Sequence, residues 1–557
     1  MLRSSPPQSG DSGRGNLDLT EREPLLVPGH HRHGMTTNAT TATISTPREH
    51  AAADMDIPVA AGHEVDDVLA KRVIRKIDRT LVPLLFITYM FNFMDKVILS
   101  SAAVFGLRED NHLEGQQYSW VGSIFYFGYL IWEYPTTVLI ARLPTAKYLV
   151  ANTFFWGAVV GLTAACSSFG GLMALRFLLG VAEATITPAF MFLTSTWYTR
   201  DEMPTRVGIW FAGNSVGGLV SSLLAFGVGH IDDGDGGIRP WRWMYIILGS
   251  ATFLWAIPML VFLPDSISKA RFLSEEERRY AAERTALAGT GSTENARWKW
   301  DQLRECLSDP KTWLIFLLEL CSQMPNGGTQ SFSNMVVSSF GFTSLQTTLI
   351  NIPYSLLSAS IIAGTGWLAG RYRTLNCLLI VAAVIPCVAG AAVMYCRDHD
   401  GVPHAAQLVA YFLLASGPAA MPLNMALVQS NYRGVTKKMT MTAMLFMAYC
   451  AGNIAGPHFF RADEDPRYGT AFGAIMVCYA LVVVLALGLR FYLRWVNDRR
   501  TREEGVEGSA GASGVVTAGA GAGVKGGAGP GVVGSGLRPE VYEDVTDWQT
   551  VGFRYRL

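Results

Sequence analysis

The sequence predicts an all-α membrane protein with twelve transmembrane helices in two six-helix halves. Three observations predict this fold. Charged residues make up only 16% of the 557 residues, against about 25% in a soluble domain, while apolar residues make up 50%. The apolar residues gather in twelve runs, each long enough to cross a hydrocarbon core of about 30 Å, which takes about 20 helical residues. One long polar connection divides these runs six plus six.

The runs are predicted to be helices because lipid offers the backbone no hydrogen-bond partner, and a barrel would show alternating strands of about ten residues. Glycine and proline recur within them, as membrane helices tolerate. The first half holds the runs 81–101, 119–140, 149–168, 171–196, 207–229 and 243–263. The second half holds the runs 312–336, 347–369, 375–396, 405–429, 439–460 and 470–493.

The ends of the chain and the connection between the halves are polar. The N-terminal residues are rich in Ser, Thr, Gly, Pro, His and acids without any period, which is typical of disorder. In the connection, Ser274 followed by Glu277 predicts a capped helix start. A Gly/Ala-rich tract near the C-terminus has too little side-chain bulk for a packed core. The predicted organisation is a disordered tail 1–70, a first half 71–263, a linker 264–311, a second half 312–500 and a disordered tail 501–557.

The positive charges predict the orientation in the membrane. Lys and Arg cluster before the first run and in the connections on the same side, at Lys71, Arg72, Arg75, Lys76, Arg79, Arg142, Lys147, Arg200, Arg206, Arg371, Arg373, Arg433, Lys437 and Lys438. The opposite connections hold mostly acids. Both termini and the linker are therefore expected in the cytoplasm, and the sequon at Asn38 is expected to stay unused. We expect the plasma membrane; an acidic dileucine pattern at Glu21–Leu26 leaves a vacuolar or endosomal membrane as the alternative.

Several classes of protein are excluded. Lys+Arg and Asp+Glu are both 45, which argues against a nucleic-acid binder. The eight cysteines are scattered without any CxxC spacing, so neither a zinc ribbon nor a disulfide scaffold is expected. HExxH and Walker-type loops are missing, which argues against an enzyme or an ATP-driven pump. We expect no cofactor, no metal and no catalytic residue.

Ionisable residues inside the predicted spans indicate functional sites, because each costs at least ~2.5–3.5 kcal/mol at mid-membrane. They are Asp95, Lys96, Glu133, Arg176, Glu183 and Glu319. Arg176 and Glu183 are seven residues apart, or two helical turns, and so share one helix face. Gly180 between them opens space for a ligand or for a neighbouring helix.

These charges suggest a site for an anion and a proton. An organic anion needs a fixed cation in a medium of low dielectric; Arg176 is the first candidate because its planar fork matches a carboxylate, and Lys96 is the second. A proton-coupled carrier also needs a carboxyl whose protonation follows substrate occupancy, a role that Asp95 or Glu183 fits. The alternative is that Asp95 pairs with Lys96, and Arg176 with Glu183, only to permit insertion.

Polar residues complete the predicted site. Asn326 and Gln330 follow Pro325 in the seventh run and are predicted substrate contacts, with a helix–helix hydrogen bond as the alternative for each. Arg142 and Lys147 are predicted to gate the cytoplasmic end of the first half, or else only to set topology. Tryptophans near the ends of the runs, Trp156 and Trp210 among them, are expected in an interfacial belt.

Six elements, in this order, resemble the fungal allantoate permease family, a group of anion:cation symporters within the major facilitator superfamily. They are Asn92–Lys96, Tyr134–Leu149, Arg176–Pro188, Ser430–Lys438, Gly452–Pro457 with Tyr468, and Glu543–Trp548 followed by Phe553–Tyr555. The chain departs from the family at Lys96, where Arg is common, and at Thr145-Ala146, where a Gly is usual.

The resemblance implies alternating access around a midplane site between the halves. It implies secondary active uptake of a small organic anion, with protons as the coupling ion, by a monomer in the lipid bilayer. Family members carry allantoate, ureidosuccinate, nicotinate, pantothenate and small peptides. The alternative function is a transporter-like nutrient sensor with little flux.

Overall fold

The computed structural model describes residues 59–199, 202–231, 237–287, 299–372, 374–396, 402–465, 467–514, 545–550 and 553–557. All twelve predicted spans are helical in it. The first half consists of α1 (Val59–Ala102), α3 (Gln117–Arg142), α4 (Thr145–Thr163), α5 (Phe169–Glu183) with α6 (Ile186–Trp197), α7 (Met203–Phe211) with α8 (Gly213–Val228), and α9 (Pro240–Phe262). A π-helical turn, Ala103–Leu107, and the short α2 (Arg108–Asp110) follow α1.

The second half repeats this number of spans. It consists of α12 (Pro310–Ser338), α13 (Ser344–Arg371), α14 (Asn376–Cys396), α15 (His404–Leu413) with α16 (Ala420–Asn431), α17 (Val435–Ala455), and α18 (Gly469–Gly514). Short 3₁₀ turns lie at Ile267–Lys269, Leu414–Ala419, Gly456–Phe459 and Ala462–Glu464. The fold is therefore the all-α arrangement of two six-helix halves that the sequence predicts.

Eight of the described helices are long and apolar enough to cross a membrane by length and composition. The spans in α3, α4, α12 and α17 fall outside that set. For α12 and α17 the reason is polar packing: Gln323 and Asn326 on α12 hydrogen-bond to Asn453 on α17. Their amides lower the hydropathy of both helices, but they face protein rather than lipid.

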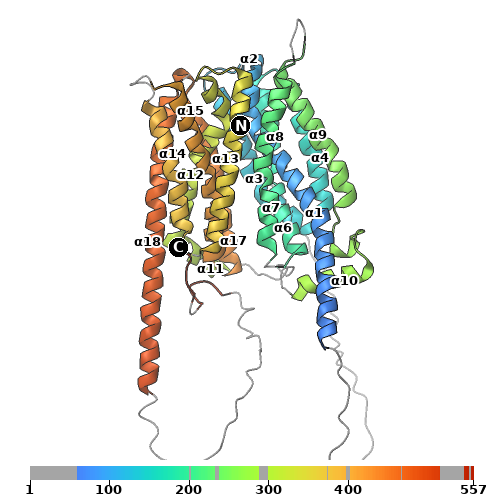
Figure 1. The fold of residues 1–557 in the computed structure, drawn as a ribbon, viewed down its shortest axis with the longest axis vertical. Coiled ribbons are helices and arrows are strands. Elements are labelled where there is room, and N and C mark those ends of the chain that lie inside the picture. The colour runs from blue at the N-terminus through green and yellow to red at the C-terminus, as the bar shows by residue number, and fades with distance from the viewer. Residues whose placement is uncertain are drawn as a thin grey trace, which may run out of the picture. The chain divides into compact units, whose positions relative to one another are not determined.

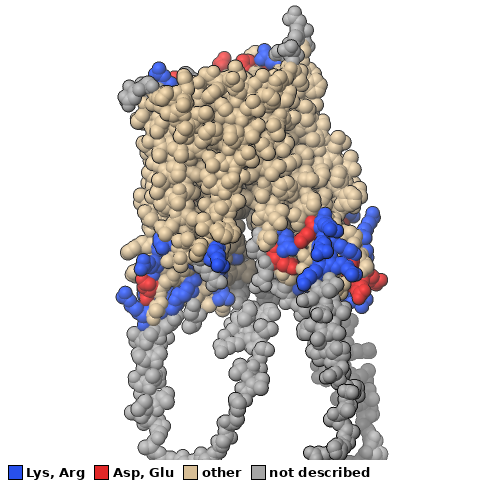
Figure 2. Space-filling model, in the orientation of Figure 1, with Lys and Arg blue, Asp and Glu red and all other residues tan. Residues whose placement is uncertain are grey.

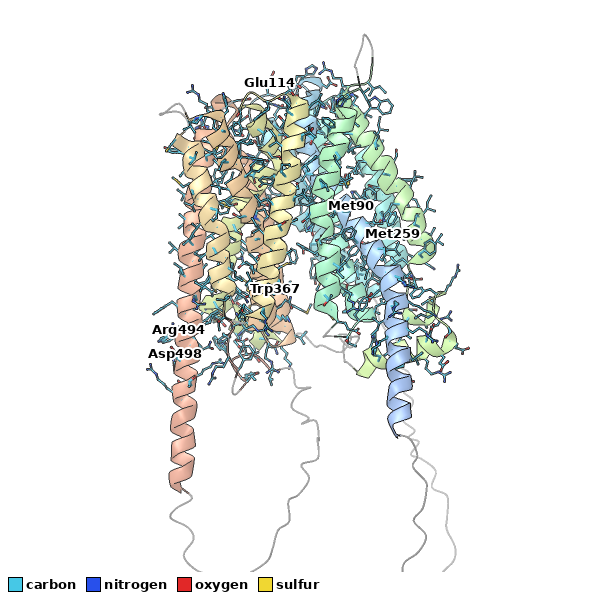
Figure 3. All side chains as sticks on the ribbon, viewed as in Figure 1. Met90, Glu114, Met259, Trp367, Arg494 and Asp498 are labelled. Atoms are coloured by element: carbon cyan, nitrogen blue, oxygen red, sulfur yellow. The ribbon has the colours of Figure 1, made fainter. Side chains whose placement is uncertain are left out.

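The two ends of the helices differ in what they carry (Figure 1). The linker helices α10 (Glu275–Leu287) and α11 (Trp300–Ser308) lie at one end, here called the linker face, and α2 lies at the opposite face. Figure 2 shows charged side chains at the two ends and a band without them between, on the side in view. In Figure 3, Glu114 marks the opposite face, Arg494 and Asp498 mark the linker face, and Met90 lies within the band.

Each linker helix is bound to one half. Glu277 at the start of α10 forms an ion pair with Lys76 of α1 at 2.7 Å. Burial opposes ionisation of the Glu277 carboxyl, but Lys76 and Ser274 outweigh it and lower its pKa. The predicted cap is confirmed, because the Glu277 amide donates to Ser274 Oγ at 3.3 Å and the Ser274 amide donates to Glu277 Oε2 at 2.9 Å. On α11, Glu305 accepts from Lys437 of α17 at 2.7 Å.

The halves are joined near the opposite face. Tyr118 donates to the Ser331 carbonyl at 2.7 Å, and Ser123 donates to the Ile454 carbonyl at 2.7 Å. Helix α8 packs on α13, and α3 packs on α17. At the linker face, by contrast, Figure 2 shows an opening between the two halves.

Glycines bring helices of the first half into backbone contact. A Cβ at Gly180 would lie 1.9 Å from the Phe125 carbonyl oxygen of α3. The space that Gly180 was predicted to open is thus taken by a neighbouring helix. Gly213 and Gly217 approach the backbone of α1 in the same way, so α8 packs closely against α1 at this stretch. Residues 213–217 also match a GxSxG pattern, but they lie within a helix rather than at a strand-to-helix turn.

We expect Gly180→Ala to reduce the yield of folded protein severely. The added methyl group cannot fit against backbone, so α3 and α5 must separate, and overpacking of this kind costs about 1–3 kcal/mol or more. The measurement is size-exclusion chromatography of a fluorescent fusion. Gly227→Ala in α8 is the control, because its Cβ would meet nothing within 4 Å. Equal monodispersity of the two variants would contradict the close contact.

Two parts of the predicted tails are ordered. Helix α1 begins at Val59, and α18 continues to Gly514. Residues 545–550 and 553–557 lie against the second half, where Asp547 is fully buried. Predictions on Asn38, Glu21–Leu26, Arg200, Arg373 and the part of the Gly/Ala-rich tract beyond residue 514 fall outside the described residues.

Candidate functional site

Four predicted site residues lie together in the first half. Asp95 and Lys96 come from α1, and Arg176 and Glu183 come from α5; we call them the charged quartet. Lys96 Nζ lies 3.3 Å from Glu183 Oε2, which makes an ion pair between the two helices. Asp95 lies within electrostatic reach of the other three members. The quartet carries two positive and two negative formal charges.

Asn92 connects the ion pair. Its Nδ2 donates to Glu183 Oε2 at 2.7 Å, and its Oδ1 accepts from Lys96 Nζ at 3.0 Å. Asn92 lies one helical turn before Lys96 on α1, so both side chains point toward the same helix. Three side chains from two helices thus close a ring of polar contacts.

The other two members bind aromatic side chains. Asp95 Oδ2 accepts from the Trp156 indole of α4 at 2.5 Å. Arg176 donates to the Tyr245 hydroxyl of α9 at 2.5 Å. Within the described residues, therefore, Lys96 pairs with Glu183 and not with Asp95, and Arg176 binds Tyr245 rather than Glu183. The predicted pairs are therefore wrong, and a purely structural role for these charges, as partners that permit insertion, stays the alternative.

The quartet contains polar atoms that the described residues leave without a hydrogen bond. They are Asp95 Oδ1, Arg176 Nε and Glu183 Oε1, all buried. Buried polar atoms are normally satisfied, and exceptions indicate strain, bound water or a functional role. The two carboxylate oxygens are available to a proton or a water molecule, and Arg176 Nε–H is available to donate to water or a substrate.

Exposure distinguishes the two cations. The Lys96 side chain is 15% exposed, whereas Arg176 is 3% exposed. Lys96 Nζ also lies 5.8 Å and 5.9 Å from the ring centroids of Phe125 and Tyr129. By exposure, therefore, Lys96 is the more accessible of the two cations, whereas the sequence placed Arg176 first.

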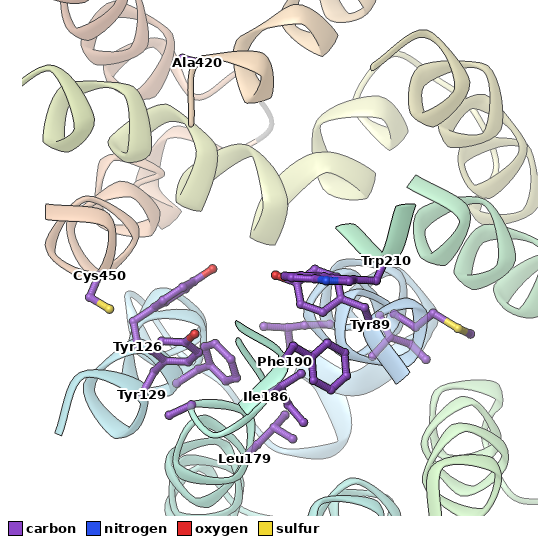
Figure 4. Packing of buried hydrophobic residues seen from close by; sticks show 14 of the residues in the cluster. Tyr89, Tyr126, Tyr129, Leu179, Ile186, Phe190, Trp210, Ala420 and Cys450 are labelled. Atoms are coloured by element: carbon purple, nitrogen blue, oxygen red, sulfur yellow. The ribbon is translucent and has the colours of Figure 1, made fainter. Parts of the chain in front are cut away.

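Aromatic side chains lie near Lys96, and Figure 4 shows how some of the buried rings of this half pack. Tyr126 and Tyr129 of α3 lie near Cys450 of α17, and Tyr126 contacts Tyr449 across the halves with a centroid distance of 5.9 Å. Figure 4 also shows Tyr89 beside Trp210 and Phe190. No role is predicted for these tyrosines from the sequence alone. The sequence feature that could have identified them is the aromatic run 125–129 on α3, whose members recur at helical spacing.

The predicted belt position is wrong for four tryptophans, which are fully buried: Trp156, Trp197, Trp210 and Trp241. Trp156 is 0% exposed and Trp210 is 1% exposed, so both are enclosed by protein rather than placed at the lipid interface. Trp156 is buried because its indole N–H has a carboxylate partner in Asp95. A tryptophan in a membrane helix can thus donate a hydrogen bond to a buried carboxylate instead of lying at the lipid interface.

Amides of the second half face α17 and the first half. Asn326 donates to Asn453 of α17 at 3.1 Å, which is the helix–helix hydrogen bond foreseen as the alternative. Gln330 accepts from the Tyr126 hydroxyl of the first half at 2.9 Å and so joins the halves. Glu319 accepts from Gln323 at 3.0 Å and from Asn424 at 2.7 Å.

The predicted gating residues lie at the linker face of the first half. Arg142 ends α3 and is exposed. Lys147 Nζ lies 3.9 Å from Asp265, and the Lys147 side chain is 71% exposed. This contact joins Lys147 to the start of the linker, and a gating role for Arg142 and Lys147 stays a prediction.

The arrangement fits binding and translocation of a small charged solute. A partly exposed cation, a buried carboxylate bonded to it and a ring of aromatic and amide groups lie between helices of two joined halves. Within the described residues, no group of three or more His, Cys, Asp or Glu side chains could hold a metal ion.

Proteins that are similar to this chain in sequence are transporters. The chain is 34% identical to the allantoate permease of Saccharomyces cerevisiae over 443 residues, which cover 77% of this chain and 80% of the relative. It is 33% identical to an uncharacterized transporter of Schizosaccharomyces pombe over 488 residues, which cover 87% of both chains. The thiamine pathway transporter of Saccharomyces cerevisiae is 30% identical over 452 residues, with 80% of this chain and 85% of the relative covered.

Solved structures show the same fold. A bacterial homologue of the human lysosomal transporter Spinster, inward-facing and unoccupied, aligns with a TM-score of 0.55 at 15% identity, covering 74% of this chain and 95% of that chain. The D-xylose-proton symporter aligns with a TM-score of 0.56 at 10% identity, covering 74% and 96%.

The sequence profile described as Major Facilitator Superfamily matches residues 85–457, from α1 to the end of α17. That match includes the linker and reaches into both halves, ending before α18. The permease likeness extends over most of both chains. The chain is therefore a membrane transporter and not an enzyme, and it belongs to the major facilitator superfamily and, within it, to the allantoate permease family.

Proposed function

We propose that the protein is a proton-coupled symporter of a small organic anion that works by alternating access. The observation that carries the proposal is the ion pair between Lys96 and Glu183, in which the cation is partly exposed and the carboxylate is fully buried. A substrate carboxylate can replace Glu183 on Lys96, and the buried Glu183 is then left to bind a proton. Anion and proton thus enter together.

The proposal assigns a role to each site residue. Lys96 binds the anion, and Glu183 carries the proton. Arg176 and Asp95 complete the charge balance beside them, each with an aromatic partner. On the second half, Asn326 and Gln330 supply amide groups to the substrate when it takes over their present hydrogen bonds. Arg142 and Lys147 are proposed to act at the linker face when the halves close there.

The anion is proposed to be a carboxylate such as allantoate, ureidosuccinate, nicotinate or pantothenate. A relative of 34% identity is named an allantoate permease, which supports this class. The linker face carries many Lys and Arg, and we propose that it faces the cytoplasm. The protein is proposed to act as a monomer in the plasma membrane.

The orientation can be tested with an epitope tag placed beyond residue 557. The tag should then bind antibody only after the cells are permeabilised.

Uptake of labelled carboxylates and ureides tests the proposal. Cells that express the chain are given each compound at external pH 5 and pH 7, with the proton gradient collapsed in a parallel sample. We expect accumulation of at least one anion, greater at pH 5, that disappears when the gradient is collapsed. Accumulation that survives the collapse would contradict proton coupling, and transport of neutral compounds alone would contradict the anion site.

A cysteine pair tests alternating access. The hydroxyls of Ser100 on α1 and Ser333 on α12 lie 3.0 Å apart near the opposite face. Oxidised Ser100→Cys/Ser333→Cys should lose at least about ten-fold in uptake, because a disulfide of about 2.05 Å prevents the halves from separating there. A reductant should restore uptake, and neither single cysteine variant should respond to oxidant. Uptake that persists in the cross-linked protein would contradict the proposed movement.

A further inference from the structure

Asn92 has no role in the charge balance, yet it contacts both members of the ion pair. Its side chain is buried, at 3% exposure. It donates to Glu183 Oε2 at 2.7 Å and accepts from Lys96 Nζ at 3.0 Å, while Lys96 and Glu183 are 3.3 Å apart. The amide is the group that holds the ammonium and the carboxylate in one geometry.

We propose that Asn92 is a positioning residue that couples anion binding at Lys96 to proton binding at Glu183. The inference rests on the proposed function and deepens it, because it states how occupancy of one group reaches the other. Asn92 does not touch the substrate or the proton in this scheme. It acts through the two side chains that do.

The coupling follows from which atoms compete. In the empty site, Glu183 Oε2 receives the Lys96 ammonium and the Asn92 amide. A substrate carboxylate that binds Lys96 draws the ammonium away from Glu183. The carboxylate then keeps only the neutral Asn92 donor, and a buried charge without a counter-ion is expensive. A proton adds to the unpartnered Oε1, so one negative and one positive charge have been taken up.

Among the groups around Glu183, Lys96 is the charge that decides whether the Glu183 carboxyl is ionised. The titratable and charged groups that face it from the packed helices are Tyr89, Asp95 and Lys96 of α1, Tyr126 of α3, and Arg176 of α5. Asp95 and Arg176 have opposite charges and offset each other. From α4, Asn152 donates to the Ala182 carbonyl at 2.6 Å and brings no charge.

An amide of this length suits the position. Asparagine presents a donor to the carboxylate and an acceptor to the ammonium at once. Aspartate would place a third carboxylate beside Glu183 and Asp95. Leucine has a similar volume but makes neither contact, so Lys96 and Glu183 would lose their common support. Asn92→Leu therefore removes the contacts to both Lys96 and Glu183. Asn92→Asp keeps an acceptor for Lys96 but replaces the donor to Glu183 by a negative charge.

The first measurement needs no substrate. Infrared difference spectra of the purified full chain record carboxyl protonation against pH, and the Glu183 band is the one that Glu183→Gln removes. In Asn92→Leu the Glu183 band should titrate about one pH unit higher than in the parent protein, because the carboxylate has lost a donor. Asn92→Asp should move it further in the same direction. Asn152→Leu, which breaks an amide contact between α4 and α5 outside the ring, should leave it in place.

The second measurement is transport of labelled allantoate in proteoliposomes. Asn92→Leu should keep exchange of internal for external allantoate within about three-fold, and lose at least ten-fold in accumulation driven by a proton gradient. An unshifted Glu183 band in folded Asn92→Leu, or accumulation that falls only in step with exchange, would overturn the proposal. If the parent protein does not carry allantoate, the proposed substrate fails while the infrared titration still decides the role of Asn92.

Discussion

Replacing Lys96 by methionine should reduce anion uptake at least about 100-fold while the protein stays inserted in the membrane. Methionine keeps the length and apolar stem of lysine but not the ammonium group. A factor of 100 corresponds to about 2.8 kcal/mol, which is the size of one charge-assisted hydrogen bond in a site of low dielectric. Uptake of the labelled anion found by the carboxylate panel is the measurement, normalised to protein at the membrane.

Loss of uptake must be separated from loss of stability. Lys96→Met leaves Glu183 buried without its cation, and breaking a buried pair costs about 3–5 kcal/mol unless the carboxyl takes up a proton. The double variant Lys96→Met/Glu183→Gln removes both charges and should regain the melting temperature without regaining uptake. Recovery of uptake in the double variant would mean that Lys96 serves only to neutralise Glu183.

Two further variants locate the anion. Lys96→Arg keeps the positive charge at this position and should retain uptake within about ten-fold. Lys269→Met, at an exposed lysine after α9, is the matched control and should have no effect. If Lys96→Met transports normally and Arg176→Met does not, then the order predicted from the sequence is correct and the exposure argument is wrong.

The fold could be predicted because the membrane restricts the possibilities. A run of about 20 apolar residues that must satisfy its own backbone can only be a helix, and a single long polar connection divides the helices six plus six. The observed helix boundaries differ from the predicted ones where a helix begins with polar residues. The predicted span 149–168 is α4, Thr145–Thr163, because Thr145 and Lys147 bring polar side chains into its first turn, which hydropathy places outside the span.

The residues of the site could be predicted, but their partners could not. A charge in an apolar run indicates a function whatever helix it faces. Which residue it meets depends on how α1 rotates against α5, and a contact between Asn92 and Glu183 spans 91 positions of sequence. Tyrosines such as Tyr126 escaped notice because a phenol ring in a membrane helix looks apolar until a partner like Gln330 is placed beside it.

The docked C-terminus could not be predicted from composition. The sequence preceding it is a low-complexity tract, and the whole range 501–557 is predicted to be a disordered tail. Order at 545–557 comes instead from single side chains that find partners far away, such as Asp547 with Lys311, 236 positions apart. We call residues 545–550 and 553–557 the C-terminal strap.

Replacing Asp547 in this strap by alanine should lower the melting temperature of the purified protein strongly. Asp547 is 0% exposed and forms ion pairs with Lys311 and, at 2.9 Å, with Lys437. The Tyr555 hydroxyl donates to it at 2.6 Å. Removing one partner from a buried ionic cluster costs about 3–5 kcal/mol, because charges stay behind in a place that water cannot reach.

Aromatic rings of the C-terminal strap should make the loss of melting temperature in Asp547→Ala greater. Lys311 Nζ lies 4.3 Å from the Tyr555 ring centroid, and Lys437 Nζ lies 4.8 Å from that of Trp548. Both rings cover ammonium groups that are almost fully buried. Without Asp547 the strap loses its anchor, and Lys311 and Lys437 must share Asp309 and Glu305 as counter-ions. Asp498→Ala, at an exposed acid of α18 on the same face, is the matched control.

The contribution of Asp547 should vanish in acid. Burial alone would raise the pKa of its carboxyl, but Lys311 and Lys437 outweigh burial and hold that pKa below its usual value. A group whose folded pKa is lowered stabilises the fold fully above its unfolded pKa of about 3.9, and loses this effect as the pH falls through the folded value. The parent protein should therefore lose melting temperature below about pH 4.

The comparison with Asp547→Asn decides whether the charge is the cause. Asparagine keeps the shape of the side chain but has no carboxylate to protonate. Its melting temperature should be lower than that of the parent at pH 7, and the two should converge as the pH falls toward 3. A constant difference over this range would mean that the strap is held by shape and by the Tyr555 and Trp548 rings. An absent difference at pH 7 would mean that Asp309 and Glu305 neutralise both lysines without Asp547.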